Sequence, residues 1–198
     1  MRDGPVAPTR GTEREGRVCE GTTTEGFGNV ADKLPAYMGE GFSLRGEKDR
    51  FVLPPDFRKG FEEIGDERVL CITKEAELPC LIAFGLSRTA YLEDMLEQEA
   101  ASARNRGVPF NYRQRAGQLF TCGKVPFDAS GRFILPAKYC KVGNISDNIC
   151  FMSGGQVIML WDLDQLGAMG PEWADQYELF LASAEEARAK AAAKGKGK

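Results

Sequence analysis

The sequence predicts an α+β fold in which two copies of one small module intertwine into a single globular unit. The first observation is a repeated segment: residues 50–54 (Arg-Phe-Val-Leu-Pro) recur as residues 132–136 (Arg-Phe-Ile-Leu-Pro). The second is the order of short strands and helices around this segment, which is the same in both halves of the chain. The third is that neither half has enough apolar sequence to bury a core alone, so we expect the two to share one.

The repeated segment has the composition of a strand that ends at a proline. Its β-branched and aromatic residues favour a strand, and proline ends the ladder of hydrogen bonds and suits the first turn of a helix. The match continues past the proline, because Phe57 corresponds to Tyr139. Such repetition predicts a surface with approximate two-fold symmetry, which an enzyme with one active site rarely needs.

The first half is expected to contain four short strands and two helices. The strands lie at residues 37–44, 50–53, 68–73 and 80–84, and the helices at 55–64 and 87–104. A charged loop at residues 45–49 separates the first two strands, and a turn at 75–79 joins the last two. Ser87 is placed to cap the second helix.

The second half is expected to repeat this order. It has a helix at residues 110–115, strands at 119–125 and 132–135, a short helix from Pro136, and hairpin strands at 149–153 and 156–161. Gly154 and Gly155 are a strong turn signal between the hairpin strands. A last helix starts near Pro171. Its large apolar residues recur at helical spacing and are predicted to pack in the core: Trp173, Tyr177, Phe180, Leu181 and Ala184.

Four segments follow from this reading. Residues 1–36 are rich in Gly, Thr, Glu and Arg and have no apolar period, so we expect a disordered N-terminal tail. The first repeat covers 37–104, and the second, with its C-terminal helix, covers 105–182. Residues 183–198 are an Ala/Lys/Gly-rich tail that begins as helix.

The composition argues against an enzyme. The chain has no histidine, which excludes Ser-His-Asp and Cys-His catalysis and every metal site with an imidazole ligand. Its six cysteines form no Cys-x-x-Cys pair, so we expect reduced core thiols and no metal. No phosphate-binding or dinucleotide motif is present, so no cofactor is expected. An enzyme that uses carboxylates or a cysteine is the alternative, and no convergent acidic pair supports it.

Positive charge is concentrated in one segment of a chain whose net charge is only −3. Residues 104–141 contain one anion, Asp128, and these cations: Arg104, Arg106, Arg113, Arg115, Lys124, Arg132, Lys138 and Lys141. This asymmetry indicates a basic face directed at an anionic partner. The alternative is a solvated basic stretch balanced by acidic helices nearby.

The loop before the second repeated segment has a specific pattern, Asp128-x-x-Gly131-Arg132. An aspartate in such a loop can hold the guanidinium or accept hydrogen bonds from backbone amides. Gly131 is suited to a positive φ, which other residues adopt at a cost. We therefore expect Asp128 and Gly131 to shape the loop that presents Arg132.

These motifs resemble the MraZ family. In the second repeat, Asp128, Gly131, Arg132, Leu135 and Pro136 match the family's D-x-x-G-R-x-x-x-P pattern, and Trp161 falls where the family tends to close its last hairpin. In the first repeat, Tyr37, Gly39 and Glu40 match the family's aromatic-x-Gly-Glu opening. Its K-x-R, L-P and F-R positions are matched by Lys48, Arg50, Leu53, Pro54, Phe57 and Arg58. The resemblance covers roughly residues 37–181 and leaves both tails outside.

The resemblance implies a fold and a function. The fold is two AbrB-like swapped-hairpin β-barrel repeats with short helices. The function is sequence-specific binding of double-stranded DNA by a repressor of the bacterial division and cell-wall gene cluster. The protein would assemble into a homo-oligomeric ring on tandem promoter repeats, in the cytoplasm and associated with the nucleoid. No membrane and no small-molecule substrate are implied.

The candidate DNA contacts are the cations of the two loops. Arg45, Lys48 and Arg50 are expected to contact DNA directly, and Arg58 to contact a phosphate or a neighbouring subunit. Arg132 either contacts DNA or braces its loop through Asp128.

The first repeat departs from the pattern at two positions. Gly46 stands where the family has aspartate, and Asp49 stands where it has glycine. These changes raise an alternative function, a ring-forming AbrB-like assembly protein that has lost specific DNA readout.

Overall fold

The computed structural model describes residues 36–195 of the protein, with side chains to residue 193. These residues belong to one compact unit. The tail expected at residues 1–36 therefore lies, apart from residue 36, outside the described residues.

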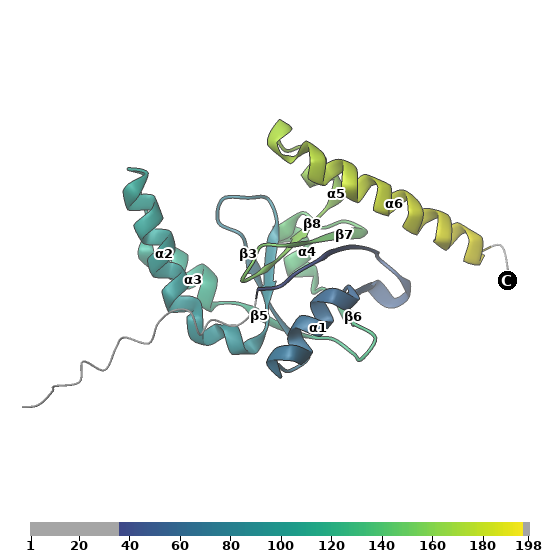
Figure 1. Ribbon diagram of the computed structural model, residues 1–198, viewed down its shortest axis with the longest axis horizontal. Coiled ribbons are helices and arrows are strands. Elements are labelled where there is room, and N and C mark those ends of the chain that lie inside the picture. The colour runs from purple at the N-terminus through teal and green to yellow at the C-terminus, as the bar shows by residue number, and fades with distance from the viewer. Residues whose placement is uncertain (1–35, 196–198) are drawn as a thin grey trace, which may run out of the picture. The chain divides into compact units, whose positions relative to one another are not determined.

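The described chain folds into two antiparallel sheets and several helices (Figure 1). The strands are β1 (Glu40–Leu44), β2 (Arg50–Val52), β3 (Val69–Lys74), β4 (Leu81–Phe84), β5 (Gly123–Pro126), β6 (Arg132–Ile134), β7 (Asn148–Ser153) and β8 (Ile158–Trp161). The helices are α1 (Pro55–Ile64), α2 (Leu92–Asn105), α3 (Tyr112–Phe120), α4 (Ala137–Gly143), α5 (Leu163–Gly167) and α6 (Ala174–Gly195). Short 3₁₀ turns are η2 (Glu47–Asp49), η3 (Leu86–Tyr91) and η4 (Pro171–Trp173). The α+β class is confirmed.

Each of the two sheets contains strands of both halves. The larger sheet has six strands in the order β1-β7-β8-β4-β3-β5, and β2 pairs with β6 in a separate two-stranded sheet. The strands thus form two sheets and do not close into the barrels expected from the sequence. Each edge strand of the larger sheet, β1 or β5, pairs with a strand of the other half.

The large sheet is symmetric in its strand order. If each strand is replaced by its counterpart in the other half, the order β1-β7-β8-β4-β3-β5 is obtained again, read from the opposite edge. Phe51 lies opposite Phe133 in the small sheet, and Ile82 lies opposite Met159 in the large one. The two phenylalanines occupy the same position in the repeated segment. Their ring centroids are 6.0 Å apart. This pairing brings the two copies of the segment side by side.

The apolar residues of the repeated segment supply the shared core. Phe51, Leu53, Phe133 and Leu135 are all buried in one cluster with residues of α1 and of the large sheet. The prolines end β2 and β6, and α1 begins at Pro55 while α4 begins just after Pro136. This agrees with the predicted strand-to-helix transition.

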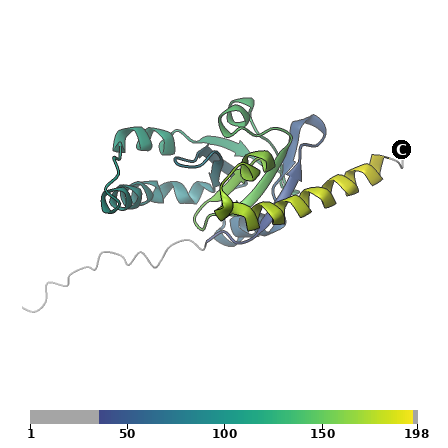
Figure 2. The ribbon, with the colours of Figure 1, turned by 90° about the horizontal axis from the view of Figure 1, so that it is seen from above.

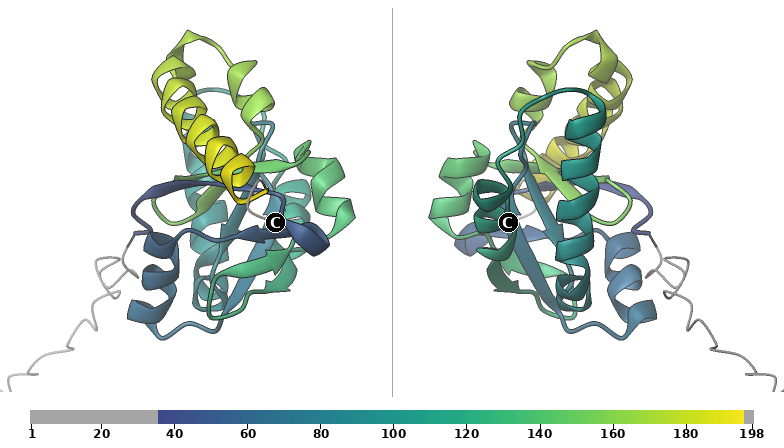
Figure 3. Two further views of the ribbon diagram at one scale, coloured as in Figure 1. Left: turned by 90° about the vertical axis from the view of Figure 1, so that its right-hand side faces the viewer. Right: turned by 90° about the vertical axis from the view of Figure 1, so that its left-hand side faces the viewer.

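A second cluster lies between the large sheet, α5 and α6. Trp161 is fully buried there and packs against Trp173 at 5.2 Å between ring centroids. Phe180 and Ala184 of α6 are buried in the same cluster, with Tyr177 and Leu181 packed partly against it. The predicted core face of the last helix is confirmed. Figures 2 and 3 show α6 crossing one side of this unit, with α2 and α3 at the opposite end.

Some expected elements differ in the second half. The strand predicted at 119–125 is wrong at its start, because α3 continues to Phe120 and β5 begins only at Gly123. The side chain of Asn111 caps α3, and Leu119 is fully buried against Ile82 and Leu96, so packing extends the helix. Helix α5 was not predicted. The Asp162 carboxylate caps it by accepting a hydrogen bond from the Asp164 amide at 2.9 Å.

Helix α6 continues through residue 183, where the C-terminal tail was expected to begin, and runs to Gly195. Within residues 36–195, no helix combines the length and the apolar content needed to cross a membrane.

Candidate nucleic-acid interface

Strands β2 and β6 form a two-stranded ribbon with one buried and one exposed face. Phe51 and Phe133 point into the core, whereas Arg50, Val52, Arg132 and Ile134 are exposed. The register places Arg50 opposite Ile134 and Arg132 opposite Val52. We call these four residues the outer face of the ribbon. The structure thus brings Arg50 and Arg132, one from each half, to the same surface.

Residues 127–131, the Asp128 loop, are organised by one carboxylate. Asp128 Oδ1 accepts hydrogen bonds from the backbone amides of Ser130 at 2.8 Å and Arg132 at 2.9 Å. These bonds favour the ionised form, and the Arg132 amide contributes most to holding the pKa of Asp128 below its usual value. The carboxylate thus holds the backbone amides of Ser130 and Arg132 in place.

The Asp128–Arg132 ion pair is loose. Arg132 Nη1 lies 3.8 Å from Asp128 Oδ2, and both side chains are about half exposed. Exposed pairs of this kind contribute little to stability, because solvent screens them. Asp128 therefore braces the loop through the main chain, and the Arg132 guanidinium stays accessible to a ligand.

Gly131 combines a positive φ with a close approach to the first half. Its φ is +80°, and a Cβ there would lie 2.6 Å from the Leu53 carbonyl oxygen and 2.8 Å from Arg58 Cδ. The Leu53 amide also donates a hydrogen bond to the Gly131 carbonyl at 2.8 Å. Both the backbone conformation and the available space therefore require glycine.

Arg58, predicted as a DNA contact, supports the Asp128 loop. It extends from α1 in the first half, and its Nη1 donates a hydrogen bond to the Ala129 carbonyl at 3.0 Å. Its methylene groups lie against Gly131. The side chain is only partly exposed, so its position is that of a support between the two halves.

Residues 45–49, the Lys48 loop, lack such a carboxylate brace. The Gly46 amide donates a hydrogen bond to the Arg50 carbonyl at 2.8 Å. The Asp128 amide makes the equivalent bond to the Arg132 carbonyl at 3.0 Å. Gly46, however, has no side chain that could accept hydrogen bonds from the loop amides. Lys48 and Asp49 have φ values of +61° and +56°. Consecutive left-handed residues other than glycine carry strain of about 1 kcal/mol or more each.

Arg45, also predicted as a DNA contact, is turned toward the second half. Its guanidinium donates to the Ser146 carbonyl and lies 5.1 Å from the centroid of the Phe51 ring. Its Nη1 is 3.7 Å from Asp49 Oδ1. Arg45 thus fixes the base of the Lys48 loop, while Lys48 and Arg50 are exposed.

A hollow of about 340 Å³ lies between the Lys48 loop and the ribbon. Its lining residues are Leu44, Gly46, Glu47, Lys48, Arg50, Val52 and Arg132. Three predicted site residues, Lys48, Arg50 and Arg132, therefore surround one depression. Glu47 is the carboxylate within it.

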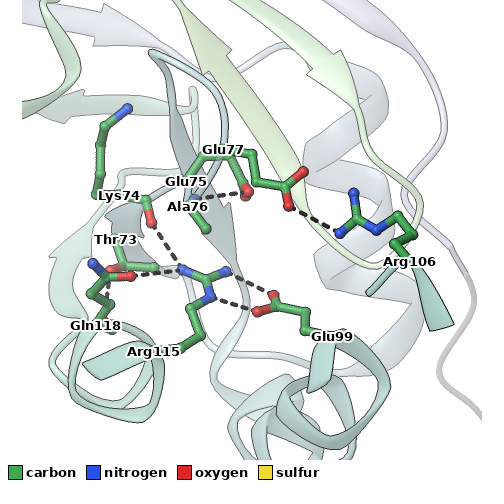
Figure 4. A network of polar contacts seen from close by, with 9 residues as sticks. All are labelled: Thr73, Lys74, Glu75, Ala76, Glu77, Glu99, Arg106, Arg115 and Gln118. Atoms are coloured by element: carbon green, nitrogen blue, oxygen red, sulfur yellow. Dashed lines mark hydrogen bonds and ion pairs between the residues drawn. The ribbon is translucent and has the colours of Figure 1, made fainter. Parts of the chain in front are cut away.

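The arginines of residues 104–115 do not join this surface. They lie on or beside α2 and α3, at the other end of the unit from β6 (Figure 1). Arg115 is buried and forms two bonds to Glu99, at 2.6 and 2.8 Å, and Arg106 lies 3.1 Å from Glu77 (Figure 4). The expectation of one basic face from residues 104–141 is therefore wrong for this part, where acidic neighbours balance the charge.

Two cysteine thiols of the described chain are kept protonated by burial. Burial raises the pKa of Cys80 and of Cys150 to about 12, so both thiols stay protonated at neutral pH. Among residues 36–195, no group of three or more His, Cys, Asp or Glu side chains is placed to hold a metal ion.

Comparison with known proteins gives one informative similarity. No protein-family model matches the chain. The chain is 25% identical over 126 residues to a protein of Phocaeicola vulgatus named transcriptional regulator MraZ, and the matched region covers 63% of this chain and 78% of that protein. The chain is a distant relative of a transcriptional regulator. This relation supports the resemblance to the MraZ family, and the relative's name does not describe an enzyme.

Two residues of the outer face were not singled out from the sequence. Val52 and Ile134 are 41% and 51% exposed, beside the arginines. The signal was present in the repeated segment, where the third position is aliphatic in both copies. Strand alternation from the buried Phe51 and Phe133 places that position on the exposed side.

Proposed function

We propose that the protein is a DNA-binding transcriptional regulator whose outer face of the ribbon, with the Lys48 loop, contacts double-stranded DNA. The observation that carries the proposal is the convergence of Lys48, Arg50 and Arg132, from both halves, around one exposed depression. Lysine and arginine neutralise phosphates, and arginine also recognises guanine through two hydrogen bonds, worth about 1–3 kcal/mol of discrimination. The distant similarity to a transcriptional regulator is an independent argument in the same direction.

One ribbon with its Lys48 loop offers only three cations, Lys48, Arg50 and Arg132, and would bind DNA weakly. We therefore propose that several subunits act together, as a homo-oligomeric ring on tandem promoter repeats, because tethered sites raise the effective concentration. In this proposal the protein is a cytoplasmic, nucleoid-associated repressor of the division and cell-wall gene cluster, as the resemblance implies.

A second candidate is an assembly protein that keeps the ring and has lost specific DNA readout. The Lys48 loop is the observation that favours it. Its backbone is strained, and the carboxylates of Glu47 and Asp49 lie among its cations. Such a protein would bind all DNA sequences alike, and only through phosphates.

Binding titrations separate the two candidates. The purified protein is titrated against DNA from upstream of its own gene and against scrambled DNA of equal length, at two salt concentrations. Preference for its own DNA that persists in added salt supports the regulator. Equal binding that disappears with salt supports the assembly protein.

Variants connect the preference to the proposed surface. Arg50→Ala and Arg132→Ala should each reduce the preference for the protein's own DNA by roughly tenfold. Arg113→Ala, at an exposed arginine of α3, is the matched control and should leave the preference unchanged. If Arg50→Ala and Arg132→Ala bind like the unaltered protein, the surface is misassigned.

A further inference from the structure

We infer that Val52 and Ile134 are specificity-determining residues that contact the C5-methyl groups of thymine in the DNA major groove. The inference rests on the proposed function, since it assigns a base feature to a surface that we propose contacts DNA. It concerns two uncharged aliphatic side chains that face away from the core.

Both residues are aliphatic at positions that usually carry polar side chains. In an antiparallel sheet with one solvated face, outward positions are typically polar. Val52 and Ile134 are 41% and 51% exposed, and the core on the other side of the ribbon is already filled by Phe51 and Phe133. The outward methyl groups therefore contribute little to the core and are available to a ligand.

In the outer face of the ribbon, the two arginines and the two aliphatic residues occupy alternate corners of a square. Arg50 lies opposite Ile134 and Arg132 lies opposite Val52, so the cations occupy one diagonal and the aliphatic side chains the other. Directly opposed side chains have Cβ atoms about 5 Å apart, and outward neighbours on one strand are about 7 Å apart. Every cation thus has an aliphatic neighbour across the ribbon and another along its own strand.

These spacings match the major groove. The groove is wide enough for a two-stranded ribbon, and two base-pair steps span about 7 Å. Suppose that the ribbon lies along the groove and one arginine binds a guanine. The aliphatic residue of the same strand then lies over a base two base-pair steps away. Thymine is the base that presents an apolar group there, its C5-methyl, which aliphatic side chains contact favourably.

The test uses a duplex chosen by the protein itself. The full chain selects the tightest duplex from a random library, and that duplex is then made with deoxyuridine replacing one thymine at a time. Deoxyuridine lacks only the methyl group and keeps the base pair. At a contacted thymine, affinity should fall about fourfold, the value expected for loss of one buried methyl group.

Variants assign the contact to the two residues. At each thymine where deoxyuridine weakens binding to the unaltered protein, either Val52→Ser or Ile134→Ser should bind the thymine and deoxyuridine duplexes with equal affinity. Both variants should keep the unfolding temperature of the unaltered protein. Val108→Ser is the matched control, because Val108 is 44% exposed in the segment between α2 and α3. It should retain the full thymine dependence.

The outcomes distinguish this inference from the proposed function. A selected duplex bound equally well with thymine or deoxyuridine at every position would overturn the inference alone. Thymine sensitivity that persists in both serine variants would do the same, because the methyl groups would be read elsewhere. A library that yields no enriched duplex would overturn both the proposed function and the inference.

Discussion

Asp49 and Gly131 occupy the same position in the two loops, and both have a positive φ. Glycine adopts this conformation freely, whereas aspartate adopts it at a cost that its short polar side chain only reduces. The Asp128 loop also gains two carboxylate–amide bonds that Gly46 cannot provide. The two loops therefore differ in backbone strain and in side-chain hydrogen bonds, although the strands that follow them are alike.

Gly131→Ala should lower the free energy of unfolding by about 2–3 kcal/mol, since it adds backbone strain and a Cβ clash with the Leu53 carbonyl. Urea denaturation measures the change. Asp49→Gly is the matched variant and should leave stability unchanged or raise it by up to about 1 kcal/mol, because it relieves the left-handed strain. A marked loss of stability in Asp49→Gly would contradict the strained loop.

The carboxylate of Asp128 gives the Asp128 loop a dependence on pH. Its pKa in the folded protein is lowered from 3.8, so the ionised form stabilises the fold. This contribution is fully present above the unfolded pKa and is lost as pH falls through the folded value. The stability difference between the unaltered protein and Asp128→Asn should therefore be constant at pH 5–7 and shrink below about pH 4. A stability difference that grows as the pH falls would contradict the lowered pKa of Asp128.

At the scale of elements, a buried ion pair is one of the contacts that join α2 and α3. Arg115 of α3 has a side chain only 5% exposed and is paired with Glu99 of α2. Its remaining donors reach the Lys74 carbonyl of β3 and the Gln118 side chain at 3.5 and 3.4 Å (Figure 4). The pair thus fixes the helices to each other and to the large sheet.

Glu99→Ala should destabilise the protein by about 3 kcal/mol, because it leaves the Arg115 guanidinium buried without its counter-ion. Glu77→Ala removes the exposed partner of Arg106 in the same region and should cost less than about 1 kcal/mol. Thermal unfolding of the two variants gives the comparison. Equal effects would show that the burial of Arg115 does not matter to stability.

Elements built on local patterns were predictable, whereas those set by tertiary packing were not. Helix α1 was expected at its observed residues, because Pro55 opens it and Gly65 ends it in the left-handed conformation. The extension of α3 to Phe120 depends on burial of Leu119 against other elements, and no local pattern specifies that burial. The short helix α5 depends on one cap, Asp162, which was not recognised.

The residues of the candidate site were likewise predictable where a local pattern specifies them, and not where tertiary packing does. The sequence identified Asp128, Gly131 and the loop cations, because a loop pattern is local. It could not show that Arg45 and Arg58 are turned toward the opposite half, since their partners Ser146 and Ala129 are distant in sequence. The exposure of Val52 and Ile134 was readable from strand alternation once the buried face of the ribbon was known.

At the scale of the whole molecule, neither sheet of the described chain belongs to one half alone. Strands β1 and β5 each pair with the opposite half, and β2 pairs with β6 and β4 with β8. The main hydrophobic cluster likewise contains residues from both halves. Opening one half would expose the strand edges and apolar surface of the other. We therefore expect the two halves to unfold together.

Two probes in different halves test this cooperativity. Both tryptophans, Trp161 and Trp173, lie in the second half, whereas Cys71 lies in β3 of the first half and is fully buried. The urea transition followed by tryptophan fluorescence should coincide with that followed by chemical labelling of the Cys71 thiol. Phe133→Ala removes a ring that packs on Phe51 and Phe151 and should shift both transitions equally, by about 3–5 kcal/mol. Labelling of Cys71 at urea concentrations where the tryptophans remain native would mean that the first half opens alone, and that the shared core does not make the two halves one cooperative unit.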